Sequence, residues 1–460
     1  MKRAFLLIPA LIITTVFSGC GQEEKTGELT LRVANWEEYM DQGEWEEAIE
    51  LSDDKELFAE NTLVDDFEIW YEETYGQKIN VEYSTYGTNE DLYNQMRLGD
   101  VFDLVCPSDY MVMKLISEDR ILPLSEEFFE TSVEENYYIK NLSPYIADQY
   151  KKLSMDGKPV YDYGAGYMWG TLGIVYNPDY ITPEDASHFS MFSDKKFYKT
   201  VTVKDSIRDT YFAGLAALNA DTLTDPDFKA DPEYKEKLTE IMNDTSEETV
   251  DEVEDILSVW RENVYSMETD SGKSDMVTGK VLANLQWSGD AVYTIDQAEE
   301  DGVYLSYSVP DETTNLWFDA WVMMKNGIAQ DSRKQQAAEA FINFISRPDN
   351  AVRNMDYIGY TSVISGGEDD STVFDYINYC YSAEEGEESV PYDISYFFDG
   401  EGAEGTYVVE APPEQLHRQL FTQYPSTEVI ERSAIMRCFD ADANERISRM
   451  WTNIRCFRLW

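Results

Sequence analysis

Aromatic rings and carboxylates recur together in this 460-residue chain, close to the ends of segments patterned as strands. A ring face attracts an ammonium group by about 0.5–2 kcal/mol, and a hydrogen bond to a charged group contributes about 1.5–3 kcal/mol. Rings combined with carboxylates therefore suit an aliphatic polycation. Any single ring is more often part of a core, so the combination carries the interpretation. Its members are Trp36, Tyr39, Tyr86, Trp169, Asp209, Trp287 with Asp290, Trp317 and Asp319.

Alternating strands and helices are predicted to position these residues. Apolar alternation and apolar runs mark the strands, and polar capping residues such as Ser108 and Asp109 precede the helices. This order predicts α/β layers with mostly parallel sheets, in which ligands bind at the carboxyl ends of the strands. The predicted strands are 29–34, 79–83, 102–106, 200–204 and 320–325, and the helices are 110–117, 205–219 and about 331–345.

Three acidic stretches, 41–60, 221–252 and 366–405, interrupt this pattern. Runs of charged side chains most often form solvated faces. We therefore expect surface insertions that have no part in ligand binding, and their role stays open.

Composition and motifs exclude several classes of protein. With 90 acidic and 36 basic side chains, the formal net charge is -54, so phosphate backbones and anionic lipid headgroups are repelled. Hydrophobic residues make up 43% and aromatic residues 14%, which indicates a folded chain. The two histidines, His188 and His417, accompany no nucleophile elbow, HExxH motif or phosphate-binding glycine loop. We predict neither nucleic-acid binding nor catalysis.

The cysteines do not suggest a metal site. Beyond Cys20 they are Cys106, Cys380, Cys438 and Cys456, and none is spaced as a CxxC pair. We expect Cys106, in an apolar strand pattern, to be a buried free thiol, and the pairing of the others stays open. No metal and no cofactor is predicted.

The amino terminus predicts export. Two basic residues precede an apolar run over residues 4–17, which is shorter than the roughly 20 residues of a spanning helix and typical of a secretory signal. The following Ser-Gly-Cys resembles the lipobox of bacterial lipoproteins, which implies a signal peptide over 1–19, lipidation of Cys20 and a tether over 20–27. An ordinary cleaved signal is the alternative. We expect an extracytoplasmic protein, either membrane-anchored by its lipid or periplasmic.

The motifs together resemble the spermidine/putrescine-binding proteins of bacterial polyamine ABC importers. The resemblance covers most of residues 29–360, with the segments in the family's order. They are NWEEY (35–39), YSTYGTNE (83–90), FDLVCPS (102–108), YMWGT (167–171), DSIRD (205–209), LQWSG (285–289), WFD (317–319) and IGY (358–360).

The resemblance implies a two-lobed periplasmic-binding-protein fold of type II, with crossing strands at the hinge. The N-terminal lobe would be 28–168 plus 319–365, and the C-terminal lobe 169–318 plus 366–460. A polyamine would be clamped between the lobes of a monomer, and the closed form would be recognised by an ABC permease.

The resemblance also assigns roles to residues. Rings would sandwich the methylenes and ammonium groups, and Asp319 would bind one ammonium. Ser206 replaces an acid used by some members, and Met436 falls roughly where the family has a polar terminal contact, so the choice between diamine and triamine stays open. The implied ligand-binding residues are Trp36, Tyr39, Ser84, Tyr86, Ser206, Asp209, Trp287, Trp317, Asp319 and Tyr360.

Two alternatives remain from the residues alone. One is a binding protein for another cationic or amino-bearing small molecule; an amino-acid site would need an arginine, and Arg208 is the arginine within the motifs. The other is an exported carbohydrate-active enzyme, in which rings stack on sugars and paired acids cut them.

Overall fold

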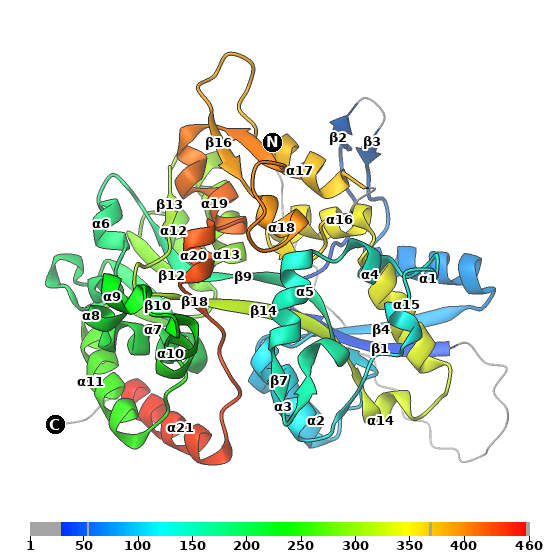
Figure 1. Cartoon of the computed structure of the whole chain (residues 1–460), viewed down its shortest axis with the longest axis horizontal. Helices are drawn as coiled ribbons and strands as arrows, with labels where there is room; N and C mark the ends of the chain where they lie inside the picture. Colours follow the sequence, from blue (N-terminus) through cyan, green and yellow to red (C-terminus); the bar gives the residue numbers. More distant parts are fainter. Residues whose placement is uncertain (1–28, 53–54, 368–369, 457–460) are drawn as a thin grey trace.

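The computed structural model describes residues 29–52, 55–367 and 370–456. Its centre is a twelve-stranded sheet with helices packed around it (Figure 1), which confirms the α/β class. Along the main path the strand order is β11, β10, β12, β9, β14, β5, β1, β4. In that order the strands span Ser266–Glu268, Val201–Lys204, Ala283–Trp287, Gly164–Tyr176, Thr314–Met324, Leu104–Val105, Leu29–Trp36 and Ile79–Tyr86.

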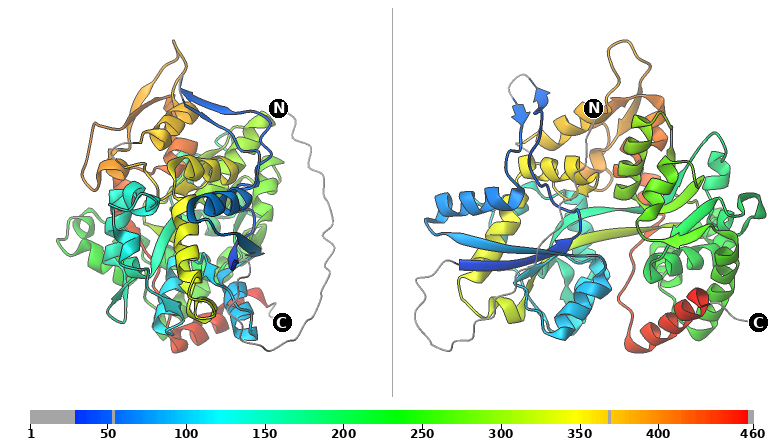
Figure 2. Two further views of the ribbon diagram at one scale, coloured as in Figure 1. Left: turned by 90° about the vertical axis from the view of Figure 1, so that its right-hand side faces the viewer. Right: turned by 180° about the vertical axis from the view of Figure 1, so that it is seen from behind.

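Two long antiparallel strands, β9 and β14, join the two halves of this sheet. Every residue of both strands is buried. On one side β14 pairs with β5, and on the other side β9 pairs with β12. Within each half the remaining main-path pairs are parallel: β1 with β4 and β5, and β10 with β11 and β12. Figures 1 and 2 show β9 and β14 running side by side from one half to the other.

The helices bury regular apolar faces against the sheet. In α1 the buried residues Leu63, Phe67 and Tyr71 recur every fourth position, and the Thr62 side chain caps the first turn by accepting from the Asp65 amide. Helix α1 spans Leu63–Tyr75. Other helices are α2 (Asn89–Leu98), α3 (Asp109–Ser117), α7 (Ile207–Leu218), α11 (Glu247–Asn263), α13 (Ser288–Glu300), α15 (Lys334–Ile345), α16 (Pro348–Ile358) and α21 (Ala441–Arg455).

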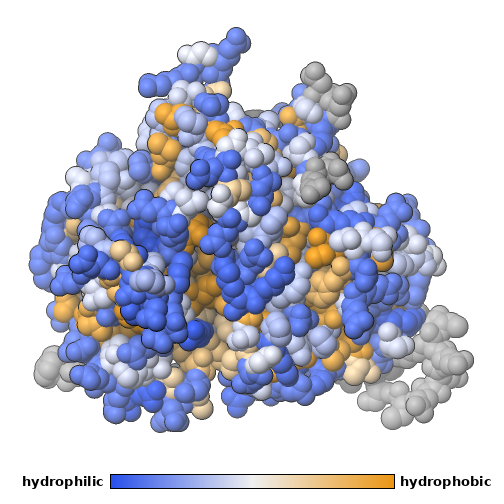
Figure 3. All heavy atoms as spheres, viewed as in Figure 1, coloured by the Kyte–Doolittle hydropathy of each residue, from blue (hydrophilic) through white to orange (hydrophobic). Residues whose placement is uncertain are grey.

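Each half has its own apolar core. The larger core combines β1, β4 and β5 with α1 and α15, and it also takes in Phe397 and Tyr424 from the last quarter of the chain. The second core combines β10 and β12 with α7, α11 and α21. On the face shown in Figure 3, hydrophilic residues cover most of the surface, and apolar residues gather in the recess between the two halves.

The predicted elements agree with the structure except at the central strands. The pattern at 102–106 yields only the two-residue strand β5, and β14 begins six residues before the predicted 320. Polar residues hid the start of β14, because a buried strand can include them when they are paired. The Thr314 hydroxyl, for example, donates to the Leu172 carbonyl at 2.6 Å.

The first and third acidic insertions pack against each other at their described residues. Residues 41–60 include the hairpin of β2 (Ile49–Ser52) and β3 (Lys55–Leu57), which lies beside α17 (Thr372–Tyr381) of the third insertion. The Lys55 ammonium is 3.2 Å from the Asp375 carboxylate across that contact. The sequence pattern missed this packing because alternating acids masked the few buried side chains.

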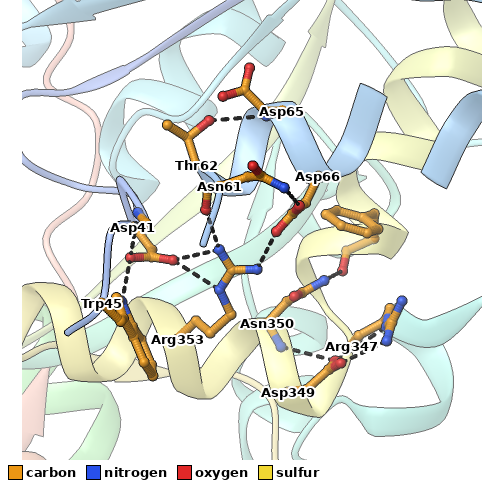
Figure 4. A network of polar contacts seen from close by, with 12 residues as sticks. Asp41, Trp45, Asn61, Thr62, Asp65, Asp66, Arg347, Asp349, Asn350 and Arg353 are labelled. Carbon is orange, nitrogen blue, oxygen red and sulfur yellow. Dashed lines mark hydrogen bonds and ion pairs between the residues drawn. The ribbon is translucent and has the colours of Figure 1, made fainter. Parts of the chain in front are cut away.

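A buried ion pair fixes the chain after β1 (Figure 4). Arg353, on α16, places its guanidinium 2.7 Å from a carboxylate oxygen of Asp41 and 2.7 Å from one of Asp66. It also donates to the Asn61 carbonyl at 2.9 Å. The Asp41 side chain is fully buried and the Arg353 side chain is 7% exposed. Arg353 thereby holds the segment that begins two residues after Tyr39.

We predict that Arg353→Ala lowers the free energy of unfolding by about 3–5 kcal/mol, because it leaves the buried Asp41 carboxylate without its counter-ion. Arg347→Ala is the matched control, because Arg347 directly precedes the first residue of α16. Its pair with Asp349 is about one-third exposed on both sides, so a loss under about 1 kcal/mol is expected. Urea unfolding measures both, and equal losses would contradict the role given to the buried pair.

Candidate functional site

The candidate site is centred on the carboxylate of Asp319, which lies in β14 where the two halves of the sheet meet. The register with β9 shifts between Phe318 and Ala320, so Asp319 occupies a β-bulge that re-aims its side chain. The Tyr39 hydroxyl donates to one carboxylate oxygen at 2.8 Å, and the Ser108 hydroxyl donates to the other at 2.7 Å. Asp319 itself is 5% exposed. Both of its oxygens are thus held by neutral donors.

Burial dominates the electrostatics of this carboxylate. It raises the pKa of Asp319 from 3.8 to about 6, against the opposing hydrogen bonds from Ser108 and Tyr39. Within the described ranges no lysine or arginine lies within ion-pairing distance of Asp319. A buried, ionised carboxylate that lacks a counter-ion is suited to receive a cation from outside the chain.

Rings enclose this carboxylate. The ring centroids of Tyr39 and Tyr360 are 5.1 Å apart, and those of Trp317 and Tyr360 are 5.6 Å apart. A second pair, Trp36 and Tyr86, has centroids 5.1 Å apart. Both members of that pair donate to the Cys106 carbonyl, at 2.8 and 2.5 Å. These ring faces are the kind of surface that attracts ammonium groups and methylenes.

Two glycines allow the rings to approach this closely. A β-carbon at Gly170 would collide with the Trp317 ring, and one at Gly289 would overlap the Tyr360 ring. In the register of β9, Gly170 lies opposite Trp317, and Leu172 lies opposite Trp287 two residues further on. Because side chains alternate along a strand, Trp317 and Trp287 leave the same face of the sheet.

A second carboxylate, Asp290, lies across Tyr360 from Asp319. The Tyr360 hydroxyl donates to Asp290 at 3.0 Å, and the Lys204 ammonium is 3.0 Å from its other oxygen. Lys273 is 3.8 Å away. Burial acts to raise the pKa of Asp290, but the charges of Lys204 and Lys273 outweigh it and hold that pKa below 3.8. Unlike Asp319, this carboxylate is already paired.

The predicted pair Ser206 and Asp209 begins α7. The Ser206 hydroxyl donates to the Asp209 carboxylate at 2.6 Å and accepts from the Asp209 amide, which is a helix-capping role. Asp209 is 5% exposed, and burial raises its pKa. Ser84 is exposed, and its hydroxyl donates to the Val33 carbonyl at 3.2 Å. Direct contact of these three residues with Asp319 is absent among the described hydrogen bonds.

The structure therefore brings together Tyr39, Trp317, Asp319 and Tyr360, with Trp36 and Tyr86 as a neighbouring wall. One ring from the sequence pattern does not belong there. Trp169 is fully buried and stacks on Phe397 with centroids 5.8 Å apart, so it is a core residue. The ligand-binding role of the ten predicted residues stays a prediction.

Sequence reasoning missed Ser108, Lys204 and Lys273, and it gave Asp290 no specific role. Ser108 was predicted only as a helix cap, yet its side chain makes no cap bond and instead binds Asp319. The sequence signal that could have identified Ser108 was its position at the end of the FDLVCPS segment (102–108), directly before α3. Lys204 ends a strand pattern next to Asp205 and Ser206, and nothing in the sequence places it beside Trp287.

A contact between the two halves lies next to the site. The Arg208 guanidinium of α7 is 4.4 Å from the centre of the Tyr110 ring of α3, and 3.6 Å from that of Phe439. These residues line a cleft of about 440 Å³ between α2 and α3 on one side and α7 and α21 on the other. Cation–π contacts of this kind hold the halves together in the structure.

Residues 29–52, 55–367 and 370–456 contain no cluster of histidine, cysteine and carboxylate side chains able to hold a metal ion. Across the same ranges, none of the helices combines the length and the apolar character needed to cross a membrane. Cys106, Cys380, Cys438 and Cys456 are all free thiols, and Cys106 is buried.

Solved structures define the class of fold. The spermidine/putrescine transporter protein of Listeria monocytogenes aligns with a TM-score of 0.62 at 20% identity, covering 93% of this chain and 99% of that chain. The substrate-binding protein of the Streptococcus pneumoniae spermidine/putrescine transporter aligns with a TM-score of 0.59 at 22% identity and the same coverage. The fold is that of the two-lobed periplasmic binding proteins, as predicted.

The sequence defines the family. Residues 62–378 match the bacterial extracellular solute-binding proteins, and the chain belongs to that family. The spermidine/putrescine-binding periplasmic protein of Salmonella typhimurium is 26% identical over 285 residues, which is 61% of this chain and 70% of the relative. The putrescine-binding periplasmic protein of Escherichia coli is 24% identical over 293 residues, 62% of this chain and 71% of the relative.

We predict that Asp319→Asn stabilises the free protein at pH 8. A folded-state pKa of about 6 against 3.8 means that ionised Asp319 costs about 3 kcal/mol of unfolding free energy. Because the folded pKa is raised, the parent regains this stability as the pH falls from 6 towards 4. Asn resembles the protonated acid, so the advantage of the variant should vanish over that window.

Urea unfolding of both proteins at pH 8, 6 and 4 measures this difference. Asp148→Asn, on the exposed face of α5 (Pro144–Lys152), is the control and should leave the unfolding free energy nearly unchanged at all three values. A variant at Asp319 that is less stable than the parent throughout would mean that the carboxylate has a structural role.

Proposed function

We propose that the protein captures a polyamine, spermidine or putrescine, between two lobes and delivers it to an ABC permease. The observation that carries the proposal is the buried Asp319 carboxylate, which neutral hydroxyls hold and rings surround. An ammonium bound there would gain a charge-assisted hydrogen bond and ring contacts together. The names of the relatives from Salmonella typhimurium and Escherichia coli support the same class of ligand.

The energetics suit a binder that performs no chemistry. Four buried methylenes contribute about 3 kcal/mol at roughly 0.8 each, and two charge-assisted ends add about 3–6 kcal/mol before the entropy cost of binding. A micromolar complex needs about 8 kcal/mol. We infer that the site binds and releases its ligand without catalysis.

Lobe closure is part of the proposal. The lobes would be 28–168 plus 319–365 and 169–318 plus 366–460, joined through β9 and β14. That division is the one implied by the sequence resemblance. Because Phe397 and Tyr424 share the core of the first half, we propose that residues 366–424 belong to the first lobe and that, of this last segment, only the residues after Tyr424 belong to the second. The contact of Arg208 with Tyr110 spans both halves and would form on closure. The closed monomer is the form that we expect the permease to recognise.

We expect calorimetry to detect putrescine or spermidine binding by the mature protein, and Asp319→Asn to weaken it by roughly 10- to 150-fold, equivalent to about 1.5–3 kcal/mol. Asn keeps the shape and removes the charge that attracts the ammonium. Asp148→Asn again serves as the control for the loss of one acidic charge. Asp290→Asn would be an unsuitable control, because Asp290 contacts Tyr360.

Other outcomes of the titration would redirect the proposal. Heat released by a sugar panel, with none from either polyamine, would favour the carbohydrate-active alternative. Tight binding of an amino acid that Asp319→Asn leaves unchanged would favour a different amino-bearing ligand.

We also propose that a lipid on Cys20 anchors the protein to the cell membrane. Cys20 lies outside the described residues, and the proposal rests on the lipobox-like sequence before it. Cys20→Ala should move the protein from the membrane fraction to the soluble fraction, because the variant lacks the residue that would carry the lipid. Polyamine affinity should not change. Equal membrane retention of parent and variant would refute the anchor.

A further inference from the structure

Lys204 is a buried lysine at the carboxyl end of β10, inside the candidate site. It is 1% exposed, although lysine is rarely buried without a partner. Its ammonium is 3.0 Å from an Asp290 carboxylate oxygen and donates to the Thr269 carbonyl at 3.0 Å. The same nitrogen lies 4.1 Å from the centre of the Trp287 ring. A carboxylate, a carbonyl and a ring face thus surround it.

These three groups form the environment that recognises a primary ammonium group. Trp287 and Asp290 lie on one β-to-helix connection, at the end of β12 and in the first turn of α13. Trp287 was predicted to stack on the ligand. In the structure, a lysine of the protein itself contacts its ring.

The carboxylates of Asp319 and Asp290 differ in the groups that donate to them. Asp319 binds the Tyr39 hydroxyl, and Asp290 binds the Tyr360 hydroxyl, while the two tyrosine rings are 5.1 Å apart. One carboxylate therefore has only neutral donors, and the other holds Lys204. Lys273, 3.8 Å from Asp290, adds a second positive charge at that end, and Asp270 lies 2.7 Å from Lys273. The buried Asp209 carboxylate also interacts with Lys204 and hydrogen-bonds to Trp287.

We propose that Lys204 supplies one of the ammonium groups that the site accommodates, so that the site prefers a diamine to a triamine. The inference rests on the proposed function. A diamine can place one ammonium at Asp319 and keep its other end clear of Lys204. A triamine carries a further positive charge, and like charges at short range in a site of low dielectric repel strongly. Lys204 is thus a specificity-determining residue.

Calorimetric titration of the mature protein with putrescine and spermidine tests the inference. The parent should bind putrescine more tightly than spermidine. Lys204→Met removes the charge and keeps an unbranched side chain only one atom shorter, so the ratio of spermidine affinity to putrescine affinity should rise by about tenfold or more. Lys196→Met is the matched control, because that lysine is about half exposed and pairs with Asp185 at 2.7 Å. It should leave the ratio unchanged.

A second variant guards against misfolding. Lys204→Gln can still donate to Asp290 and Thr269 without a charge, and it should shift the ratio in the same direction. Tighter spermidine than putrescine binding by the parent overturns the inference and leaves the proposed function intact. So does a ratio that neither Lys204 variant changes, which would make Lys204 a structural partner of Asp290. Absence of binding to both amines overturns the proposed function and the inference with it.

Discussion

The antiparallel pairing of β9 with β14 is the constraint on which the rest of the structure depends. Both strands are buried along their whole length, so their backbone polar groups must be paired with protein. Each half of the sheet attaches to them, β5 on one side and β12 on the other. A single irregularity in this pairing, between Phe318 and Ala320, aims Asp319 out of the ladder. The candidate site is therefore built into the most constrained backbone of the molecule.

Hydrogen-bonded neighbours explain how the Asp319 carboxylate can stay buried in this position. An ionised carboxylate in a buried position lowers stability unless donors satisfy its oxygens. Tyr39, in the segment after β1, and Ser108, in the segment after β5, supply those donors. Further hydrogen bonds hold each of these two residues in place. The Tyr39 carbonyl accepts from the Asn35 amide at 3.1 Å and from the Tyr167 hydroxyl at 2.8 Å. The Ser108 hydroxyl accepts from the Asn89 amide at 3.1 Å. Such pre-organisation lets a binding site keep a charge that the fold alone would not favour.

The sequence predicts individual helices and strands better than it predicts which side chains come into contact in the fold. Alternation identified β1 and β4, and capping residues identified α3 and α7, because both signals act within a few residues. The full extent of β14 was hidden, since a strand buried on both faces shows no period of two. For the same reason Trp169 could not be assigned to the core. The side chains that meet at Asp319 come from positions up to 280 residues apart, and no local pattern encodes that distance. Only the resemblance of whole motifs indicated it.

The strong negative charge of the chain cannot by itself choose among polyamines. With a formal net charge of -54, the surface attracts every cation. In physiological salt this attraction is screened beyond about 8 Å, and it favours a triamine over a diamine simply because the triamine is more charged. A preference in the opposite direction has to come from short-range groups inside the site. Lys204 places a positive charge against a ring and a carboxylate there. Exposed carboxylates can be neutralised by surface lysines, and burying a lysine lowers stability. The burial of Lys204 in so acidic a chain is therefore better explained by a role in ligand selectivity than by a need for counter-ions.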